Sequence, residues 1–152
     1  MGSSVYLWNA SSGSVEKLCD LGTTDKITSL SWIGAGTHIA VGTNNGLVQI
    51  WDAQTSKCTR TMTGHTARAS SLAWNEHILT SGSRDRSILH RDVREPDHYM
   101  KKINYHQQEI CGLKWNVEEN KLASGGNDNK LYVWDALNET PLYKFEHNAA
   151  VK

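Results

Sequence analysis

The feature that most constrains the fold is a repeat of about 41 residues that runs through the chain. One strand-like run returns four times, as "VYLWNA", "VQIWDA", "ILHRDV" and "LYVWDA". Two further series keep the same period: tryptophans at steps of 42 and 41, and histidines at steps of 41. They are Trp32, Trp74 and Trp115, and His65, His106 and His147. Repeats of 40 to 45 residues with four short strands each are typical of propeller blades.

Each repeat contains a strand, a turn and a second strand. Apolar and polar residues alternate over short runs, and Gly, Asn, Asp or Thr separate the runs, which is the pattern of β-hairpins. The turns fall at Thr43–Gly46, Ser83–Arg86 and Gly126–Asn129. No amphipathic helix is apparent. We therefore expect an all-β fold, a β-propeller fragment with about three complete four-stranded blades and a partial blade at each end. The expected limits are 1–22 for the first partial blade, about 23–60, 61–102 and 103–145 for the complete blades, and 146–152 for the start of the next.

The third turn holds a carboxylate, Asp128, between two asparagines. A carboxylate folded back over a blade is tolerated only if other groups donate hydrogen bonds to it. The repeat puts His106 in the preceding loop, Ser124 on the strand before the turn and Trp134 on the strand after it. We expect a structural network from Asp128 through His106 and Ser124 to the indole N–H of Trp134.

The other repeats match this pattern less well. In the second, His65, Ser81 and Asp85 occupy the equivalent positions, but Arg91 stands where the tryptophan is expected. The sequence therefore predicts an incomplete network there. In the first repeat only Trp51 fits.

Asn127 and Asn129 flank the carboxylate and are expected to project from the turn into solvent. An asparagine beside a turn commonly serves the backbone, because it tolerates left-handed geometry. Two amides that frame one turn can also bind a peptide, because each offers two donors and an acceptor. The residues alone leave both roles open.

Composition excludes several classes of function. Sixteen Lys and Arg balance sixteen Asp and Glu, so no long-range attraction to nucleic acid or to a membrane is expected. No apolar run approaches the roughly 20 residues of a membrane span, and no secretory leader is apparent, so we expect the nucleus and cytoplasm. The cysteines lack the spacing of a disulfide framework or a zinc site. They are Cys19, Cys58 and Cys111.

Catalysis is not expected either. The evenly spaced histidines fall in different blades, too far apart to meet at one metal ion. No paired carboxylates and no Ser-His-Asp or Cys-His signature occur. We expect no catalytic residue, no metal and no cofactor.

Three stretches carry a resemblance to a known family: "TGHTARASSLAWNEHILTSGSRDRSILHRDVREP", "QEICGLKW" and "LASGGNDNKLYVWD". They resemble the WD-repeat propeller of the Fizzy and Fizzy-related co-activators of the anaphase-promoting complex, and "SGSRDRSIL" is closer to the Fizzy-related branch. The similarity covers nearly the whole chain. The family propeller has seven blades, so the resemblance implies that residues 1–152 are part of a single WD-repeat domain.

The resemblance implies a substrate-recognition subunit. Such a propeller recruits degron-bearing cell-cycle proteins for ubiquitination and proteasomal degradation, and pseudosubstrate inhibitors also bind it. Asn127 and Asn129 match the family residues that bind the Lys-Glu-Asn degron. Val5, Tyr6 and Leu7 could form one wall of a partial destruction-box groove. The family's ligase-docking motifs do not occur in this sequence, so contact with the anaphase-promoting complex is expected through segments outside it.

A second interpretation remains open at this point. A generic WD-repeat scaffold for protein interactions, without any degron preference, would share every structural feature above. Only the "GGNDN" context separates the two interpretations.

Overall fold

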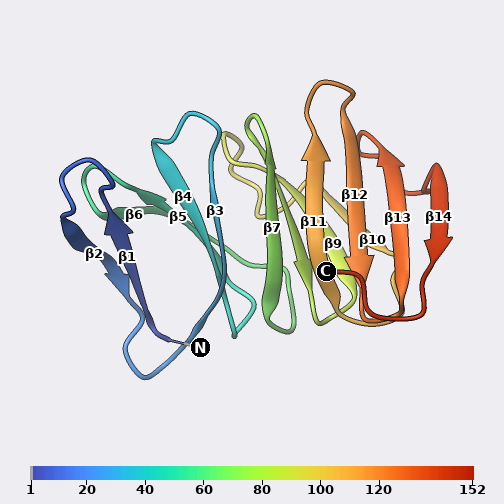
Figure 1. The fold of residues 1–152 in the computed structure, drawn as a ribbon, viewed down its shortest axis with the longest axis horizontal. Helices are drawn as coiled ribbons and strands as arrows, with labels where there is room; N and C mark the ends of the chain where they lie inside the picture. The colour runs from blue at the N-terminus through green and yellow to red at the C-terminus, as the bar shows by residue number, and fades with distance from the viewer. Residues whose placement is uncertain (1) are drawn as a thin grey trace.

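The computed structural model describes residues 2–152 and is built of antiparallel β-strands joined by turns and loops (Figure 1). It contains three four-stranded sheets and one two-stranded hairpin, which confirms the expected all-β propeller fragment. No described segment forms a helix of the length and apolar character that a membrane crossing requires.

The strands follow the repeat. The hairpin pairs β1 (Ser4–Trp8) with β2 (Val15–Asp20). The first sheet contains β3 (Ile27–Trp32), β4 (His38–Thr43), β5 (Val48–Asp52) and β6 (Lys57–Met62). The second contains β7 (Ala69–Asn75), β8 (Ile78–Ser83), β9 (Ser87–Asp92) and β10 (Lys101–Asn104). The third contains β11 (Ile110–Asn116), β12 (Lys121–Gly126), β13 (Lys130–Asp135) and β14 (Tyr143–Glu146). The outer strands β6, β10 and β14 thus run one or two residues past the blade limits given above.

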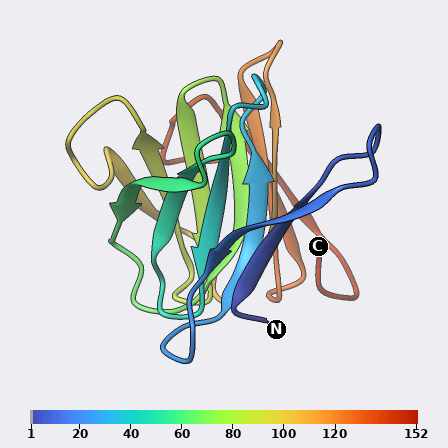
Figure 2. The same cartoon turned by 90° about the vertical axis from the view of Figure 1, so that its left-hand side faces the viewer.

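Each sheet is a meander whose strands lie in sequence order. The innermost strands are neighbours, since β7 contacts β3 on one side and β11 on the other (Figure 1). The outer strands lie away from them, and the connection between β9 and β10 projects outward (yellow in Figure 2). This arrangement of sheets around a shared inner side is that of propeller blades.

The hydrophobic core is divided among the interfaces between sheets. One cluster, containing Val5, Leu18 and Ile39, joins the β1–β2 hairpin to the first sheet. Two larger clusters lie between the first and second sheets and between the second and third. The cluster between the second and third sheets includes both aromatic residues of β13, Tyr132 and Trp134. Alternation along each strand places these residues on the faces that meet a neighbouring sheet.

Hydroxyl groups add a polar contact between innermost strands. The Ser29 hydroxyl donates to the Ala69 carbonyl oxygen at 2.7 Å, and the Ser70 hydroxyl donates to the Ile110 carbonyl oxygen. The second and third sheets approach closely here because β8 has a glycine, Gly82, where it faces β11. A Cβ at Gly82, for example, would lie 2.5 Å from Ile110 Cγ2.

The three hairpin turns share one backbone conformation. The last residue of each has positive φ: 85° at Gly46, 74° at Arg86 and 64° at Asn129. Each backbone N–H at these positions donates to the carbonyl oxygen three residues earlier. The turns therefore occupy the residues expected from the sequence, and they share one end of the molecule, because β4, β8 and β12 hold the same place in their sheets.

Candidate functional site

The candidate site is the β12–β13 turn, Gly126 to Asn129, and Asp128 fixes its shape. The Asp128 carboxylate accepts hydrogen bonds from the backbone N–H of Gln107 at 2.9 Å and of Lys130 at 3.2 Å. It also lies 3.0 Å from His106 Nδ1. These bonds tie the turn to the loop that precedes β11.

The chain of bonds continues into the blade. His106 Nε2 lies 2.8 Å from the Ser124 hydroxyl, which accepts from the Trp134 indole N–H at 2.9 Å. Because the indole can only donate, the Ser124 hydroxyl accepts from it and keeps its own proton free to donate to His106 Nε2. His106 Nδ1–H can then donate to Asp128. The structure thus brings all four residues of the expected network together.

Burial and hydrogen bonding set the charge states in this network. Burial disfavours an ionised carboxyl, but the Gln107 N–H and His106 outweigh it and hold the pKa of Asp128 below its ordinary value. Burial lowers the pKa of His106, against the opposing effect of Asp128. An ionised Asp128 and a neutral His106 fit the direction of the hydrogen bonds.

The second sheet holds a matching network, and here the sequence-based prediction is wrong. His65 lies 3.0 Å from Asp85 and 2.8 Å from the Ser81 hydroxyl, as the repeat suggests. Arg91 does not interrupt the network, because its Nε–H donates to Ser81 Oγ at 3.2 Å, in place of the indole. A guanidinium N–H serves the hydroxyl as an indole N–H does, which the residue types alone did not reveal.

Arg91 also does more than the tryptophan could. Its Nη1 donates to the carbonyl oxygens of Thr63 and His98, at 2.6 Å each. The side chain is fully buried, and burial lowers the pKa of Arg91 to about 10. It remains a cation at neutral pH and anchors the connection between β9 and β10.

Asn127 is half-buried rather than projecting into solvent. Its backbone N–H donates to the Glu109 carbonyl oxygen at 2.9 Å. Its side-chain Oδ1 accepts from the Cys111 thiol at 3.1 Å. Among the described residues its Nδ2 has no hydrogen-bond partner, so two amide donors remain available to a ligand.

Asn129 is also half-buried, and its left-handed backbone conformation is one reason for an asparagine at this position. Asparagine tolerates this conformation better than most residues do. Within residues 2–152 its side-chain amide makes no hydrogen bond, so the backbone role leaves the amide unused. The turn geometry and ligand binding are therefore compatible roles for this residue.

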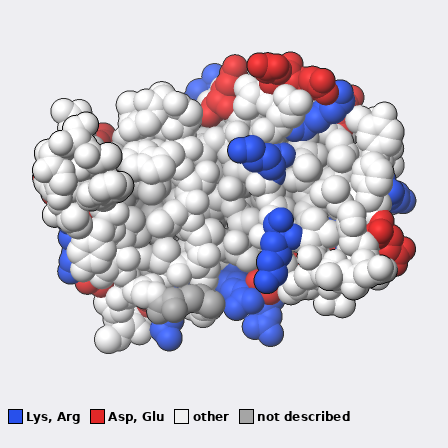
Figure 3. All heavy atoms as spheres, viewed as in Figure 1, with Lys and Arg blue, Asp and Glu red and all other residues white. Residues whose placement is uncertain are grey.

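A shallow hollow of about 300 Å³ lies beside Asn127, near the ends of the innermost strands. Arg68 and Glu109 cross it as a two-bonded ion pair, with N–O distances of 2.6 and 2.7 Å. The remaining lining residues are Thr28, Ser70, Cys111 and Lys152. On the face shown in Figure 3, Asp and Glu gather at the upper edge, Lys and Arg lie at the centre and the lower edge as well as beside the acidic group, and most of the left side is uncharged.

Sequence reasoning missed Arg68, Glu109 and Cys111. Their spacing to Asn127 carries no motif: Arg68 comes from the preceding repeat, and Glu109 and Cys111 come from the same repeat as Asn127. Arg68 and Glu109 are 41 residues apart, so the repeat period places them at the same point of adjacent blades. That period could have identified the pair.

The three β1 residues expected to border a groove do not share one environment. Val5 is buried in the cluster between the hairpin and the first sheet, and Leu7 packs against that cluster. Tyr6 is 57% exposed. Of the three, only Tyr6 presents most of its side chain to solvent.

The other polar residues considered as site candidates do not form a common site. His65 and His106 each belong to the network of their own sheet. Over residues 2–152, no three His, Cys, Asp or Glu side chains are grouped so that they could hold a metal ion. Cys19, Cys58 and Cys111 are free thiols.

Comparison with known proteins identifies the repeat. The family model "Anaphase-promoting complex subunit 4 WD40 domain" matches residues 4–77, and the model "WD domain, G-beta repeat" matches residues 98–135. Among solved structures, a chain of "Crystal Structure of Mitotic Checkpoint Complex" superimposes with a TM-score of 0.94 at 44% identity. The match covers 97% of this chain and 46% of that chain.

Curated relatives match the chain over its whole length. It is 58% identical to WD repeat-containing protein srw1 of Schizosaccharomyces pombe and 56% identical to APC/C activator protein CDH1 of Saccharomyces cerevisiae. It is 54% identical to Protein FIZZY-RELATED 2 of Arabidopsis thaliana. The chain spans 28%, 27% and 32% of these relatives. With the propeller blades and the "GGNDN" turn, these matches show that the chain belongs to the Fizzy-related family of WD-repeat proteins.

Proposed function

We propose that this chain is part of a substrate-recognition propeller of an anaphase-promoting complex co-activator. In this proposal Asn127 and Asn129 bind the Lys-Glu-Asn degron of cell-cycle proteins, which are then ubiquitinated and degraded by the proteasome. The 56% identity to a protein named as an APC/C activator supports this role.

The observation that carries the proposal is the division of roles within the turn. Asp128 is committed to the blade through its hydrogen bonds to His106 and two backbone N–H groups. The amides on either side have donors without partners among the described residues, although both are half-buried. A turn that needed only backbone geometry would need asparagine at position 129 alone, because only that residue has positive φ.

The turn is suited to binding because it is already ordered. Asn127 is held by the Glu109 carbonyl and by the Cys111 thiol, so little side-chain entropy is lost when a ligand binds. Short extended degrons bind such sites weakly, and several degrons on one substrate raise the effective affinity. Binding is therefore by shape and hydrogen bonding, and we infer no catalytic role for the chain.

The test is a titration of a labelled Lys-Glu-Asn peptide into the full-length protein, with a scrambled peptide for comparison. The informative variant is Asn127→Ala with Asn129→Gly, because glycine keeps the positive φ at position 129 and removes only the amide. We expect saturable binding by the parent and a loss of at least about tenfold in affinity, or roughly 1.4 kcal/mol, in the variant.

The matched control is Asn44→Ala, which removes an exposed amide at the equivalent position of the β4–β5 turn. It should bind the peptide as the parent does. Equal binding by the parent and the double variant, at equal melting temperatures, would contradict the proposal. That result would favour the alternative, a WD-repeat scaffold without degron preference.

The partners follow from the same proposal. They are degron-bearing substrates and pseudosubstrate inhibitors at the propeller, and the anaphase-promoting complex through segments outside this chain, with neither nucleic acid nor a membrane. The Tyr6 side chain remains a candidate wall of a destruction-box groove. The nucleus and cytoplasm are the proposed location, which imaging of a tagged protein through the cell cycle would test.

A further inference from the structure

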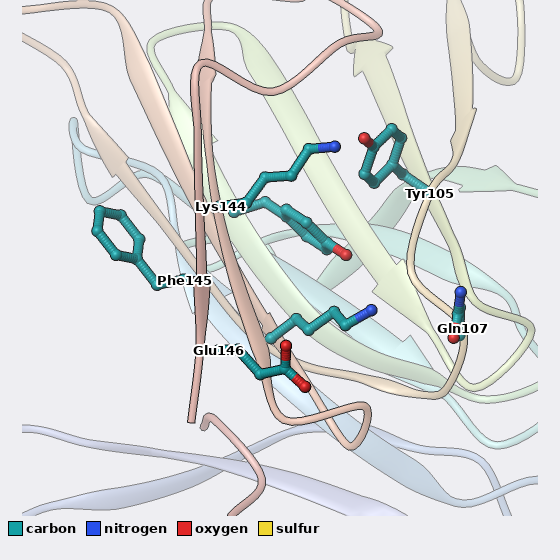
Figure 4. Close-up of a pocket in the computed structure, with 7 residues that line it drawn as sticks. Tyr105, Gln107, Lys144, Phe145 and Glu146 are labelled. Carbon is teal, nitrogen blue, oxygen red and sulfur yellow. The ribbon is translucent and has the colours of Figure 1, made fainter. Parts of the chain in front are cut away.

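A pocket of about 410 Å³ opens on the side of the third sheet (Figure 4). It lies between the outer strands β13 and β14 and the loop that precedes β11. Its lining residues are Tyr105, Gln107, Lys130, Tyr132, Lys144, Phe145 and Glu146. Neither Asn127 nor Asn129 lines it, so it is separate from the turn discussed above.

Two lysines give the pocket its charge. Lys130 and Lys144 lie on the same face of the sheet, because Tyr132 pairs with Lys144 and Lys130 pairs with Glu146 in the β13–β14 register. Among residues 2–152 neither ammonium group forms an ion pair within 4.0 Å or a side-chain hydrogen bond. The Glu146 carboxylate is the only acidic group of the lining. One positive charge of the lining therefore remains unbalanced.

Two tyrosine rings give the pocket an apolar wall. Tyr105 and Tyr132 meet edge to face with centroids 5.0 Å apart, and Tyr132 is only 3% exposed. The Lys144 ammonium lies over the Tyr105 ring, 4.9 Å from its centroid, and points toward it (Figure 4). A cation–π contact holds the lysine in place.

The neighbouring strand indicates what kind of molecule could enter. β14 is the outer edge of the third sheet, and all four of its residues are exposed. An edge strand offers unpaired backbone N–H and C=O groups to an extended peptide. A peptide that pairs there places alternate side chains beside Lys144. The side chain of Phe145 points away from the pocket (Figure 4).

We propose that this pocket binds an acidic side chain, a carboxylate or a phosphate, of an extended peptide that lies along β14. The acidic group sits between Lys130 and Lys144, and an apolar neighbour on the peptide packs against Tyr105. This site is independent of the degron proposal, because it uses other residues and another ligand chemistry.

The test is fluorescence anisotropy with the full-length protein and three labelled peptides of one sequence, Gly-Ala-Phe-Xaa-Ala-Gly. Xaa is glutamate, phosphoserine or glutamine, so the arms separate a carboxylate from a phosphate and from a neutral amide. We expect at least one acidic peptide to bind tenfold or more tightly than the glutamine peptide. Addition of inorganic phosphate at the same concentration as the peptide should not displace it.

Variants locate the site. Lys144→Gln and Lys130→Gln should each weaken binding of the acidic peptide at least fivefold, whereas Lys144→Arg should retain it. The matched control is Lys57→Gln, the same charge change at an exposed position of β6 in the first sheet. Its affinity should equal that of the parent.

Three outcomes in the binding comparisons would overturn the proposal, and a fourth is the absence of any binding. The three are equal binding of the acidic and glutamine peptides, equal binding by Lys144→Gln and the parent, and complete displacement by equimolar inorganic phosphate. Absence of binding by a parent with a normal melting temperature would do the same. None of these results bears on the Lys-Glu-Asn titration, which probes the turn with a different peptide.

Discussion

Three adjacent residues of the β12–β13 turn differ in their physical roles. Asp128 is bonded into the blade, and Asn129 adopts the left-handed backbone that closes the turn. The side-chain Oδ1 of Asn127 accepts a hydrogen bond from a thiol. The charge lies at the centre because only that side chain folds back over His106. The flanking positions thereby keep uncharged amides at the surface.

Asp128→Ala is expected to destabilise the protein by roughly 1–3 kcal/mol, because His106 Nδ1 and the N–H groups of Gln107 and Lys130 lose their acceptor. Thermal and urea unfolding measure the effect. Asp135→Ala is the control, since Asp135 is exposed on the same sheet. Unfolding curves of Asp128→Ala that coincide with those of the parent would show that the network contributes nothing.

His90 should make stability depend on pH. It is fully buried, and burial, with a smaller effect of Lys101, lowers the pKa of His90 to about 4. A histidine whose folded pKa is depressed takes up its proton more readily in the unfolded state. Its contribution is therefore complete above the unfolded pKa of about 6.5 and is lost as the pH falls toward 4, by about 2 kcal/mol between pH 7 and pH 5.

The lowered pKa values of His65 and His106 act in the same direction. Urea unfolding at pH 7 and pH 5 checks the prediction. His90→Leu should reduce the loss of stability between the two pH values, whereas His147→Leu, at an exposed position, should leave it unchanged. The same loss in both variants would exclude His90 as a source.

At the scale of an element, Arg91 links strand β9 to the connection that follows it. Arg91→Leu leaves the Ser81 hydroxyl and the carbonyls of Thr63 and His98 without their donor. The Ser81 hydroxyl is buried, and leaving a buried group unsatisfied costs about 1–3 kcal/mol. Hydrogen–deuterium exchange should show faster exchange in residues 93–100.

Arg84→Leu is the comparison, because Arg84 is exposed in the β8–β9 turn of the same sheet. Its exchange in residues 93–100 should match that of the parent. If Arg91→Leu also exchanged there like the parent, the connection would be held by other contacts, such as the bonds from Arg60 to Asp97 and to Val93.

The hairpins were predictable from sequence because alternation and turn residues are local signals. The turn at Gly126–Asn129 and the pairing of Asp128 with His106 followed from the repeat alone, whereas the backbone N–H donors of Gln107 and Lys130 did not. Three features were not predictable, because they depend on contacts between repeats or on an unusual donor. They are the bonding of Arg91, the burial of Val5 and the half-buried position of Asn127 beside Cys111.

At the scale of the whole molecule, the sheets depend on one another through their close approach. Gly82→Ala would put a methyl group 2.5 Å from Ile110 Cγ2, so β8 and β11 must move apart. Overpacking of this kind costs typically 1–3 kcal/mol. A lower melting temperature is expected, whereas Gly34→Ala should melt like the parent, because no atom lies within 4 Å of a Cβ at Gly34. A Gly82→Ala protein with the parent's melting temperature would contradict this account.

The tryptophans of the innermost strands also make adjacent sheets depend on one another. Trp74 donates to the Ser31 carbonyl oxygen at 3.1 Å, and Trp115 donates to the Thr80 hydroxyl at 2.9 Å. Each indole thus bonds to the preceding sheet and not to its own. Stability in such an array is shared between nearest neighbours, so the loss of one indole should weaken two adjacent sheets together. Loss of an indole would therefore destabilise the two sheets that meet at its interface. A sheet that does not touch that interface would keep its protection from hydrogen exchange.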